Sequence, residues 1–113
     1  MLRTALTAFF LVTGSALAAQ TDPLVPIAEA ERGSFVTLAG EVTRILDEDT
    51  FRLTDASGDI RVYIGPNRMP VRPGDRVSIS GFVDDDLFGP REIYADTAQL
   101  ADGSTVAFDR RYD

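Results

Sequence analysis

The sequence predicts an all-β domain, a small antiparallel barrel of five strands preceded by one short helix. Three observations support this prediction. Apolar and polar residues alternate with a period of two from Ser34 onward, which is the pattern of half-buried strands. Clusters of turn residues separate these runs at regular spacing. No helical segments alternate with the strands, so a parallel sheet built from βαβ units is not expected.

Residues 1–18 are expected to be a secretory signal peptide. Arg3 supplies the positive charge, Ala5 to Val12 form the apolar run, and Ala16-Leu17-Ala18 offers the small side chains needed for cleavage after Ala18. The apolar run is shorter than the roughly 20 residues that span a bilayer. We therefore expect an exported chain without a membrane span, with an uncleaved anchor or a buried amphipathic helix as the alternative.

Composition narrows the classes of function. All eighteen acidic residues follow the leader, and ten arginines remain once Arg3 is removed, so the mature chain has a net charge of −8. Nucleic-acid-binding domains usually carry a basic surface, so we expect no nucleic acid partner. Cysteine and histidine are absent, which excludes disulfides and disfavours a tight zinc or copper site. Without a histidine base or a thiol nucleophile we expect no enzyme, no metal and no cofactor.

The mature chain begins with a lead-in and a helix. Residues 19–26 are polar and contain proline, and we expect them to be flexible. Pro26 suits a first helical turn and Gly33 suits a helix end, which predicts a short helix between them. Five strands follow, with these residues facing the core: Val36, Leu38, Gly40 and Val42 in the first; Phe51 and Leu53 in the second, Thr50 to Asp55; Ile60, Val62 and Ile64 in the third; Val77, Ile79, Gly81 and Val83 in the fourth, Arg76 to Val83; Ile93, Ala95 and then Ala98 or Leu100 in the fifth, from about Glu92 to Leu100.

The connections complete the expected topology. The stretch from Gly65 to Asp75 contains three prolines and two glycines, so we expect a wrapped loop, with at most one helical turn, in which Met69 and Val71 plug the barrel. Residues 102–113 form a polar extension with a short strand around Thr105 to Phe108. A long first strand bent at Gly40 and a break after the third strand match the order of an OB-fold, although a sandwich fragment or an SH3-like barrel would share the spacing.

Four segments in order resemble the bacterial OB-fold (BOF) family of small periplasmic stress-tolerance proteins. They are VTLAGEV at Val36–Val42, DASGDIRV at Asp55–Val62, VRPGDRV at Val71–Val77 and ISGFVD at Ile79–Asp84. The resemblance covers roughly Ile27 to Leu100 and places the domain at residues 27–101. It implies an OB barrel in the periplasm, without enzymatic activity, that binds small molecules or proteins and contributes to tolerance of oxidative, metal or antimicrobial-peptide stress. This chain departs from the family pattern in two places. The family would have an aromatic plug near Asn67 to Met69, in the loop from Gly65 to Gly74, and the tail after Leu100 is longer than the family's.

An OB barrel usually binds its ligand on the outer side of the second and third strands, between two flanking loops. Arg52, Thr54, Arg61 and Tyr63 are expected on that face, and the loops carry the acidic triplets Asp47-Glu48-Asp49 and Asp84-Asp85-Asp86. Carboxylates around a cleft repel a polyanion and attract cations. The candidate ligand is therefore a small cationic molecule or a basic peptide, and weak calcium binding would need both loops to converge. The alternative is that the acidic loops only confer solubility, while Arg52 and Arg61 pair with acids across the hairpin.

A different class of function is suggested by Phe82, Leu87 and Phe88. Phe82 alternates outward on the fourth strand, and Leu87 and Phe88 stand at a loop tip where turn residues would suffice. An exposed aromatic loop beside acidic residues is typical of a protein interface, which predicts an adaptor that docks on an envelope protein. The alternative is that Leu87 and Phe88 fold back and cover the end of the barrel.

Overall fold

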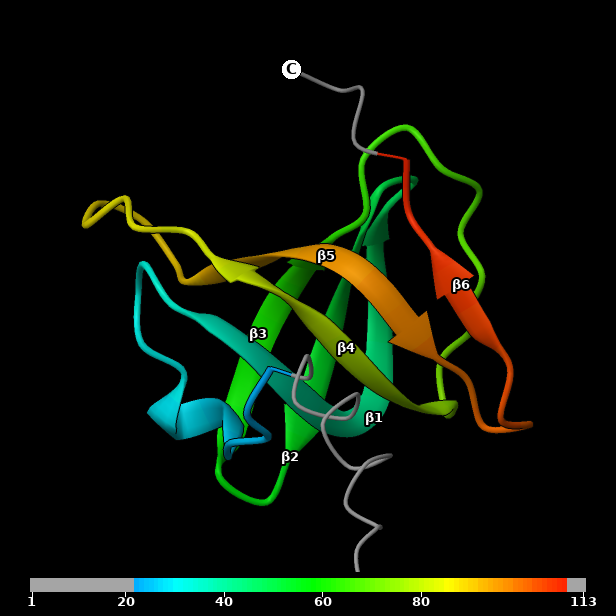
Figure 1. Cartoon of the computed structure of the whole chain (residues 1–113). Helices are drawn as coiled ribbons and strands as arrows, with labels where there is room; N and C mark the ends of the chain where they lie inside the picture. Colours follow the sequence, from blue (N-terminus) through cyan, green and yellow to red (C-terminus); the bar gives the residue numbers. More distant parts are fainter. Residues whose placement is uncertain (1–21, 110–113) are drawn as a thin grey trace, which may run out of the picture.

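Strands from residues 22–109, the part of the chain that the computed structural model describes, form one sheet that closes into a barrel (Figure 1). The strands are β1 (Phe35–Asp47), β2 (Thr50–Asp55), β3 (Gly58–Tyr63), β4 (Arg76–Val83), β5 (Glu92–Gln99) and β6 (Thr105–Ala107). Their order is β3-β2-β1-β4-β5-β6, and a further pairing between β3 and β5 closes the first five strands into a barrel. The predicted five-stranded barrel is confirmed, whereas the expected signal peptide lies outside the described residues.

The long strand β1 belongs to both halves of the barrel. Its first half pairs with β4 and its second half pairs with β2. Gly40 lies where the two halves meet, and a Cβ there would stand 2.4 Å from the carbonyl oxygen of Thr54. Gly81 is equally confined, because its Cβ would lie 2.1 Å from the carbonyl oxygen of Tyr94. Glycine at both positions lets neighbouring strands cross closely and bend around the core.

The core lies inside the barrel and is formed mainly by the side chains that the alternation predicted to face inward, together with Ile27, Ala30, Val71 and Phe108 from outside those strands. The largest fully buried residues are Phe51, Ile27, Leu38, Leu53, Ile64, Ile79, Ile93, Val42, Val62 and Val83. In β5 the inward residues Ile93 and Ala95 are followed by Ala98, because a bulge shifts the register between β4 and β5. Burial of these apolar side chains supplies the main stabilising term of a barrel that contains no cysteine.

The predicted N-terminal helix is shorter than expected. It is one turn of 3-10 helix, Ile27–Glu29, and Ala30 already has extended backbone angles. Side chains from other parts of the chain bind the backbone groups of this turn. The side chains of Asp55 and Ser57 accept hydrogen bonds from the N–H groups of Ile27 and Ala28, at 3.0 and 2.9 Å. Nη1 of Arg91 donates to the carbonyl oxygens of Ile27 and Ala30, both at 2.8 Å.

Both ends of the described chain pack against the barrel. Residues 22–26, part of the expected flexible lead-in, run beside β1, where Thr37 exchanges backbone hydrogen bonds with Val25 and Pro23. At the other end β6 pairs with β5, and Phe108 is buried in the core. The tail therefore adds a strand to the sheet and an aromatic side chain to the core.

The loop between β3 and β4 contains no helical turn within its described residues. Val71 is buried and Met69 packs against the core from a partly buried position, in agreement with the prediction that these two side chains fill this end of the barrel. Across residues 22–109, no helix has the length and hydropathy needed to cross a membrane.

Candidate functional site

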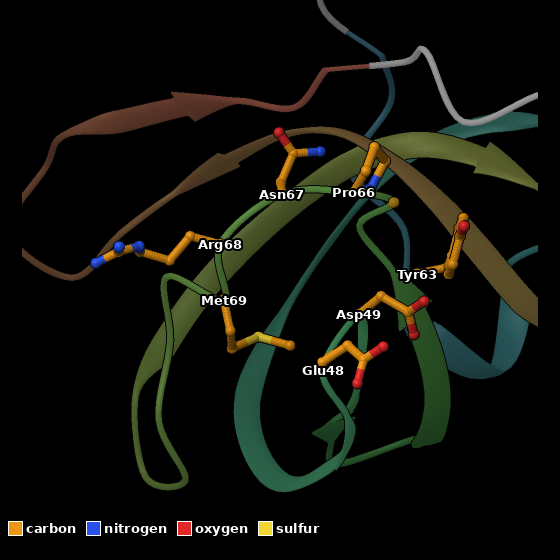
Figure 2. A pocket seen from close by; sticks show the side chains of 8 residues that line it. Glu48, Asp49, Tyr63, Pro66, Asn67, Arg68 and Met69 are labelled. Carbon is orange, nitrogen blue, oxygen red and sulfur yellow. The ribbon is translucent and has the colours of Figure 1, made fainter.

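A hollow of about 560 Å³ lies between the β1–β2 turn and the loop that follows β3 (Figure 2). Glu48 and Asp49 place their carboxylates side by side on one wall, and Tyr63 stands on another. Met69 points into the hollow toward Glu48, whereas Arg68 extends away from it (Figure 2). The hollow thus combines two negative charges with a phenol ring and a thioether.

Local hydrogen bonds hold the acidic turn in place. Oγ1 of the buried Thr50 donates to Oδ1 of Asp49 at 2.9 Å, and the backbone oxygen of Asp49 accepts from the N–H of Ile64 at 2.9 Å. Oδ1 of Asp47 accepts from the N–H of Glu48 at 2.7 Å. The side chain of Asp47 is therefore hydrogen-bonded within its own turn, while the backbone of Asp49 is hydrogen-bonded to the residue that follows β3.

The opposite wall is held by the side chain of Asn67. Its Nδ2 donates to the carbonyl oxygens of Ile64 and Asp109, at 2.7 and 3.1 Å, and its Oδ1 accepts from the N–H of Asp109 at 3.0 Å. The amide thereby joins the loop after β3 to the tail after β6. This connection gives the hollow a fixed wall in a loop that lacks regular secondary structure.

The aromatic wall continues from the hollow onto the closing pair of strands. Tyr63 lies opposite Tyr94 in the parallel pairing of β3 with β5, and the rings meet edge to face with centroids 5.9 Å apart. Glu92 precedes Tyr94 on the same outward face of β5. The acidic and aromatic groups therefore form one surface across β3 and β5.

The pKa values show which charges share this surface. Burial is the largest cause that raises the pKa of Glu92; Arg61 opposes the rise, and Asp84 and Asp49 add to it. Burial also raises the pKa of Tyr94, together with the negative charges of Asp84 and Glu92, a hydrogen bond with Asp84 and the charge of Asp86. Two loops distant in sequence therefore contribute negative charge near Glu92.

The surface suits an organic cation better than a metal ion. Carboxylates attract an ammonium or guanidinium group, and tyrosine faces add a cation–π attraction of about 0.5–2 kcal/mol. Within residues 22–109, no group of three or more acidic side chains is arranged to hold a metal ion. The condition for weak calcium binding, convergence of both triplets on one point, is thus not met in that part of the chain.

The structure gathers some of the predicted site residues and separates others. Glu48, Asp49 and Tyr63 line one hollow. Asp84 belongs to the same surface, because its charge raises the pKa of both Glu92 and Tyr94. Asp85 instead faces the segment before β1, since a Cβ on Gly33 would lie 3.6 Å from its own Cβ. The β1–β2 turn is at the top of Figure 1 and the β4–β5 loop extends to the left. The six carboxylates therefore do not surround a single groove.

Arg52 and Arg61 do not pair with acids across the hairpin. They lie directly opposite each other in the β2–β3 register. Arg61 reaches β5 instead, with its Nε 4.0 Å from Oε2 of Glu92. Both line a second hollow, of about 260 Å³, which is separate from the acidic one.

The apolar loop residues are exposed. Leu87 and Phe88 are 77% and 86% exposed, so the expectation that they fold back over the barrel is wrong. Phe82 points outward as predicted and contacts Phe35, with ring centroids 5.0 Å apart and the rings tilted by 55°. Arg32 donates to the carbonyl oxygens of Asp86 and Gly89 and so holds the loop beside the segment before β1.

Glu92 and Tyr94 were not predicted as site residues. Both alternate outward at the start of the fifth strand, which the sequence pattern does show. Their partners on β3 depend on the parallel β3–β5 register, and no alternation within either strand encodes that register.

The closed five-stranded barrel, with a long first strand shared between its halves, defines an OB-fold protein. Residues 15–100 match the family model described as "Bacterial OB fold (BOF) protein". The chain belongs to this family, and the family resemblance seen in the sequence is confirmed.

Individual proteins agree with this assignment. The chain is 34% identical over 67 residues to a Haemophilus influenzae protein described as uncharacterized; the match covers 57% of this chain and 55% of that protein, so the chain spans about half the length of that relative. It resembles the hypothetical protein ygiW from E. coli, with a TM-score of 0.58 and 30% identity over 74% of this chain and 92% of that one. The telomere capping protein Ten1 from Saccharomyces pombe has a TM-score of 0.58 at 17% identity over 74% of this chain and 84% of its own, which shows the fold alone. An OBody bound to hen egg-white lysozyme likewise shows the fold alone, with a TM-score of 0.52 at 20% identity over 65% of this chain and 87% of its own.

Proposed function

We propose that this protein is an exported, non-enzymatic binding protein whose acidic and aromatic surface takes a small organic cation or a basic side chain of a peptide. Its cellular role would be tolerance of stress in the periplasm. The observation that carries the proposal is the position of Glu92, whose pKa is raised by burial and by the carboxylates of Asp84 and Asp49, against the effect of Arg61. A bound cation would offset this concentration of negative charge.

The shape of the surface supports an elongated ligand. One end is the hollow lined by Glu48 and Asp49, and the tyrosine pair leads from there to Asp84 on the next loop. A polyamine or a peptide with two basic residues would reach both ends. A polyanion such as nucleic acid would meet like charge at both.

The test is a titration of the isotope-labelled mature protein with spermine, with a lysine-containing peptide and with single-stranded DNA at physiological salt. The cations should shift the amide signals of Asp49, Tyr63, Glu92 and Tyr94. Asp49→Asn should weaken cation binding by about tenfold, the effect of one charge contact near a protein surface. Glu29→Gln removes an exposed carboxylate of the 3-10 turn and serves as the matched control. Equal weakening by both variants, or DNA binding in preference to spermine, would reject the proposal.

A second candidate function is the adaptor, and the exposure of the β4–β5 loop favours it. Leu87 and Phe88 are exposed apolar side chains on a loop whose backbone is held by Arg32. Such a positioned anchor would enter a pocket of an envelope protein. Recovery of partners from periplasmic and outer-membrane extract should fall with Phe88→Asp, and equal recovery by both proteins would reject the adaptor.

A further inference from the structure

Three arginines lie side by side on the outer face of the barrel. Arg44 on β1 is opposite Arg52 on β2, which is opposite Arg61 on β3. We call these three residues the arginine row. A bulge in β1 creates the alignment, because Thr43 is an extra residue between the Val42–Leu53 and Arg44–Arg52 pairs and leaves both Thr43 and Arg44 exposed.

The row is an unexpected arrangement in an acidic chain. Like charges directly opposite each other in a sheet are destabilising, and eighteen acidic residues are available as partners. Yet within residues 22–109 neither Arg44 nor Arg52 takes part in a hydrogen bond or ion pair of its guanidinium group, and Arg61 contacts Glu92 only at 4.0 Å. Two guanidinium groups therefore keep all their donors available.

A hollow beside the row provides space for a ligand. It measures about 260 Å³, and Arg52, Arg61 and Arg91 line it together with Asp59, Ile60 and Pro90. Asp59 is the one acid among these lining residues; it lies opposite Thr54, two pairs away from Arg52 and Arg61. Three guanidinium groups against one carboxylate leave the hollow positive. Arg91 already donates to the carbonyl oxygens of Ile27 and Ala30, so Arg52 and Arg61 are the two members of the row that face the hollow, and Arg44 extends the row beyond it.

We propose that the arginine row binds a compact oxyanion with two or more charged groups, of the polyphosphate type. Neighbouring strands lie about 4.8 Å apart, so the row spans roughly 10 Å, which matches a short chain of phosphates. Guanidinium groups donate in pairs to phosphate oxygens. A longer polyanion would be repelled by Glu92, which lies beyond Arg61 at one end of the row. It would also be repelled by the acidic β1–β2 turn near the row. The site is distinct from the acidic surface, and Arg61 and Glu92 mark the boundary.

Binding of tripolyphosphate at low salt, measured by calorimetry, tests the proposal. The wild-type protein should bind, and Arg52→Gln and Arg44→Gln should each weaken binding about tenfold, while Arg52→Lys should lose part of the affinity because it keeps the charge without the paired donors. Arg72→Gln is the control, since Arg72 is an exposed arginine of the β3–β4 loop outside the row. Equal affinity in wild type and the row variants, or an equal loss in Arg72→Gln, would overturn the proposal.

Thermal unfolding gives a second readout. Without the anion, Arg52→Gln should melt at a higher temperature than wild type, because one like-charge contact is removed. With tripolyphosphate, wild type should gain more melting temperature than the variant, because the variant binds the anion about tenfold more weakly. A gain of equal size in both proteins would reject the site.

The source of the phosphate groups can be separated in the same series. The protein can be tested with phosphatidylcholine vesicles that contain or lack phosphatidate. Arg52-dependent binding only to the vesicles with phosphatidate would identify a lipid headgroup, whereas binding to tripolyphosphate but not to these vesicles would identify a soluble anion. Tighter Arg52-dependent binding of single-stranded DNA than of tripolyphosphate would show that the compact-anion assignment is wrong.

Discussion

Arg61 and Glu92 lie opposite each other in the parallel pairing of β3 with β5, with 4.0 Å between Nε and Oε2. Both are partly exposed, and such a pair contributes only about 0–1 kcal/mol to stability. Its significance is its position. Arg61 ends the arginine row and Glu92 begins the acidic surface, so surfaces of opposite charge meet at the strands that close the barrel.

The first prediction is that Glu92→Gln stabilises the protein at neutral pH. Burial, Asp84 and Asp49 together raise the pKa of Glu92 above its ordinary value of 4.5 although Arg61 lowers it. Because the folded-state pKa is higher than the unfolded one, the wild type loses stability as pH rises from about 4.5 through the raised pKa. The variant lacks this loss. Urea unfolding of both proteins from about pH 4 to about pH 7 should show a difference that grows with pH, and a difference independent of pH would contradict the prediction.

The second prediction concerns the strand crossing at Gly81. A methyl group at this position would lie 2.1 Å from the backbone oxygen of Tyr94, so Gly81→Ala must separate β4 from β5 and should cost about 3 kcal/mol or more. Gly58→Ala is the control, because its Cβ would meet only Ala28 at 4.0 Å. Denaturant unfolding compares them, and similar midpoints for both variants would show that the crossing is not as tight as described.

The third prediction is that Asp55 connects the β2–β3 turn to the N-terminal segment. Its Oδ1 accepts from Ser57 and Gly58, and its Oδ2 accepts from the N–H of Ile27. Burial raises the pKa of Asp55, but these hydrogen bonds together lower it by more than burial raises it, so the net shift is downward. Asp55→Asn replaces one accepting oxygen with a donor and should cost about 2 kcal/mol at neutral pH.

The pH dependence of Asp55 has the opposite sign to that of Glu92. Because its folded-state pKa lies below 3.8, its contribution is present above that pH and is lost as pH falls through the folded value. Asp102→Asn is a matched control, since Asp102 makes the same contacts to Ser104 that Asp55 makes to Ser57, but none is described to another element. Equal effects of the two substitutions would show that the bond to Ile27 contributes nothing.

The fourth prediction is that the C-terminal extension belongs to the folding unit. Phe108 is 6% exposed and packs in the core, so Phe108→Ala should lower the free energy of unfolding by about 3–5 kcal/mol. Thr105→Ala changes an exposed residue of β6 and should have little effect. If a chain ending at residue 101 unfolds at the same denaturant concentration as the full mature chain, the prediction is wrong.

The strands were predictable because each carries its own alternation. Thr50–Asp55 and Arg76–Val83 were predicted to the residue, since alternating apolar side chains end at clear turn residues in both. The helix was overestimated for a reason outside its own sequence. Its backbone groups bind Asp55 and Ser57 of the β2–β3 turn and Arg91 before β5, two other parts of the chain, and such contacts are not encoded locally.

The site was predictable only where it is local. The acidic β1–β2 turn and Tyr63 could be recognised from their positions along the chain, and they do line one hollow. The meeting of Tyr63 with Tyr94 depends on the parallel register of β3 and β5. The arginine row depends on a bulge at Thr43 that no turn residue marks. Both features arise from pairings between strands, which periodicity within one strand does not specify.

The pairing that closes the barrel spans only three residue pairs, Arg61–Glu92, Val62–Ile93 and Tyr63–Tyr94. Two of those three pairs also belong to the charged and aromatic surfaces. A molecule that bridges β3 and β5 on the acidic and aromatic surface would therefore slow the transient separation of these strands, and amide hydrogen exchange at Val62 and Ile93 would report its occupancy without any label on the ligand.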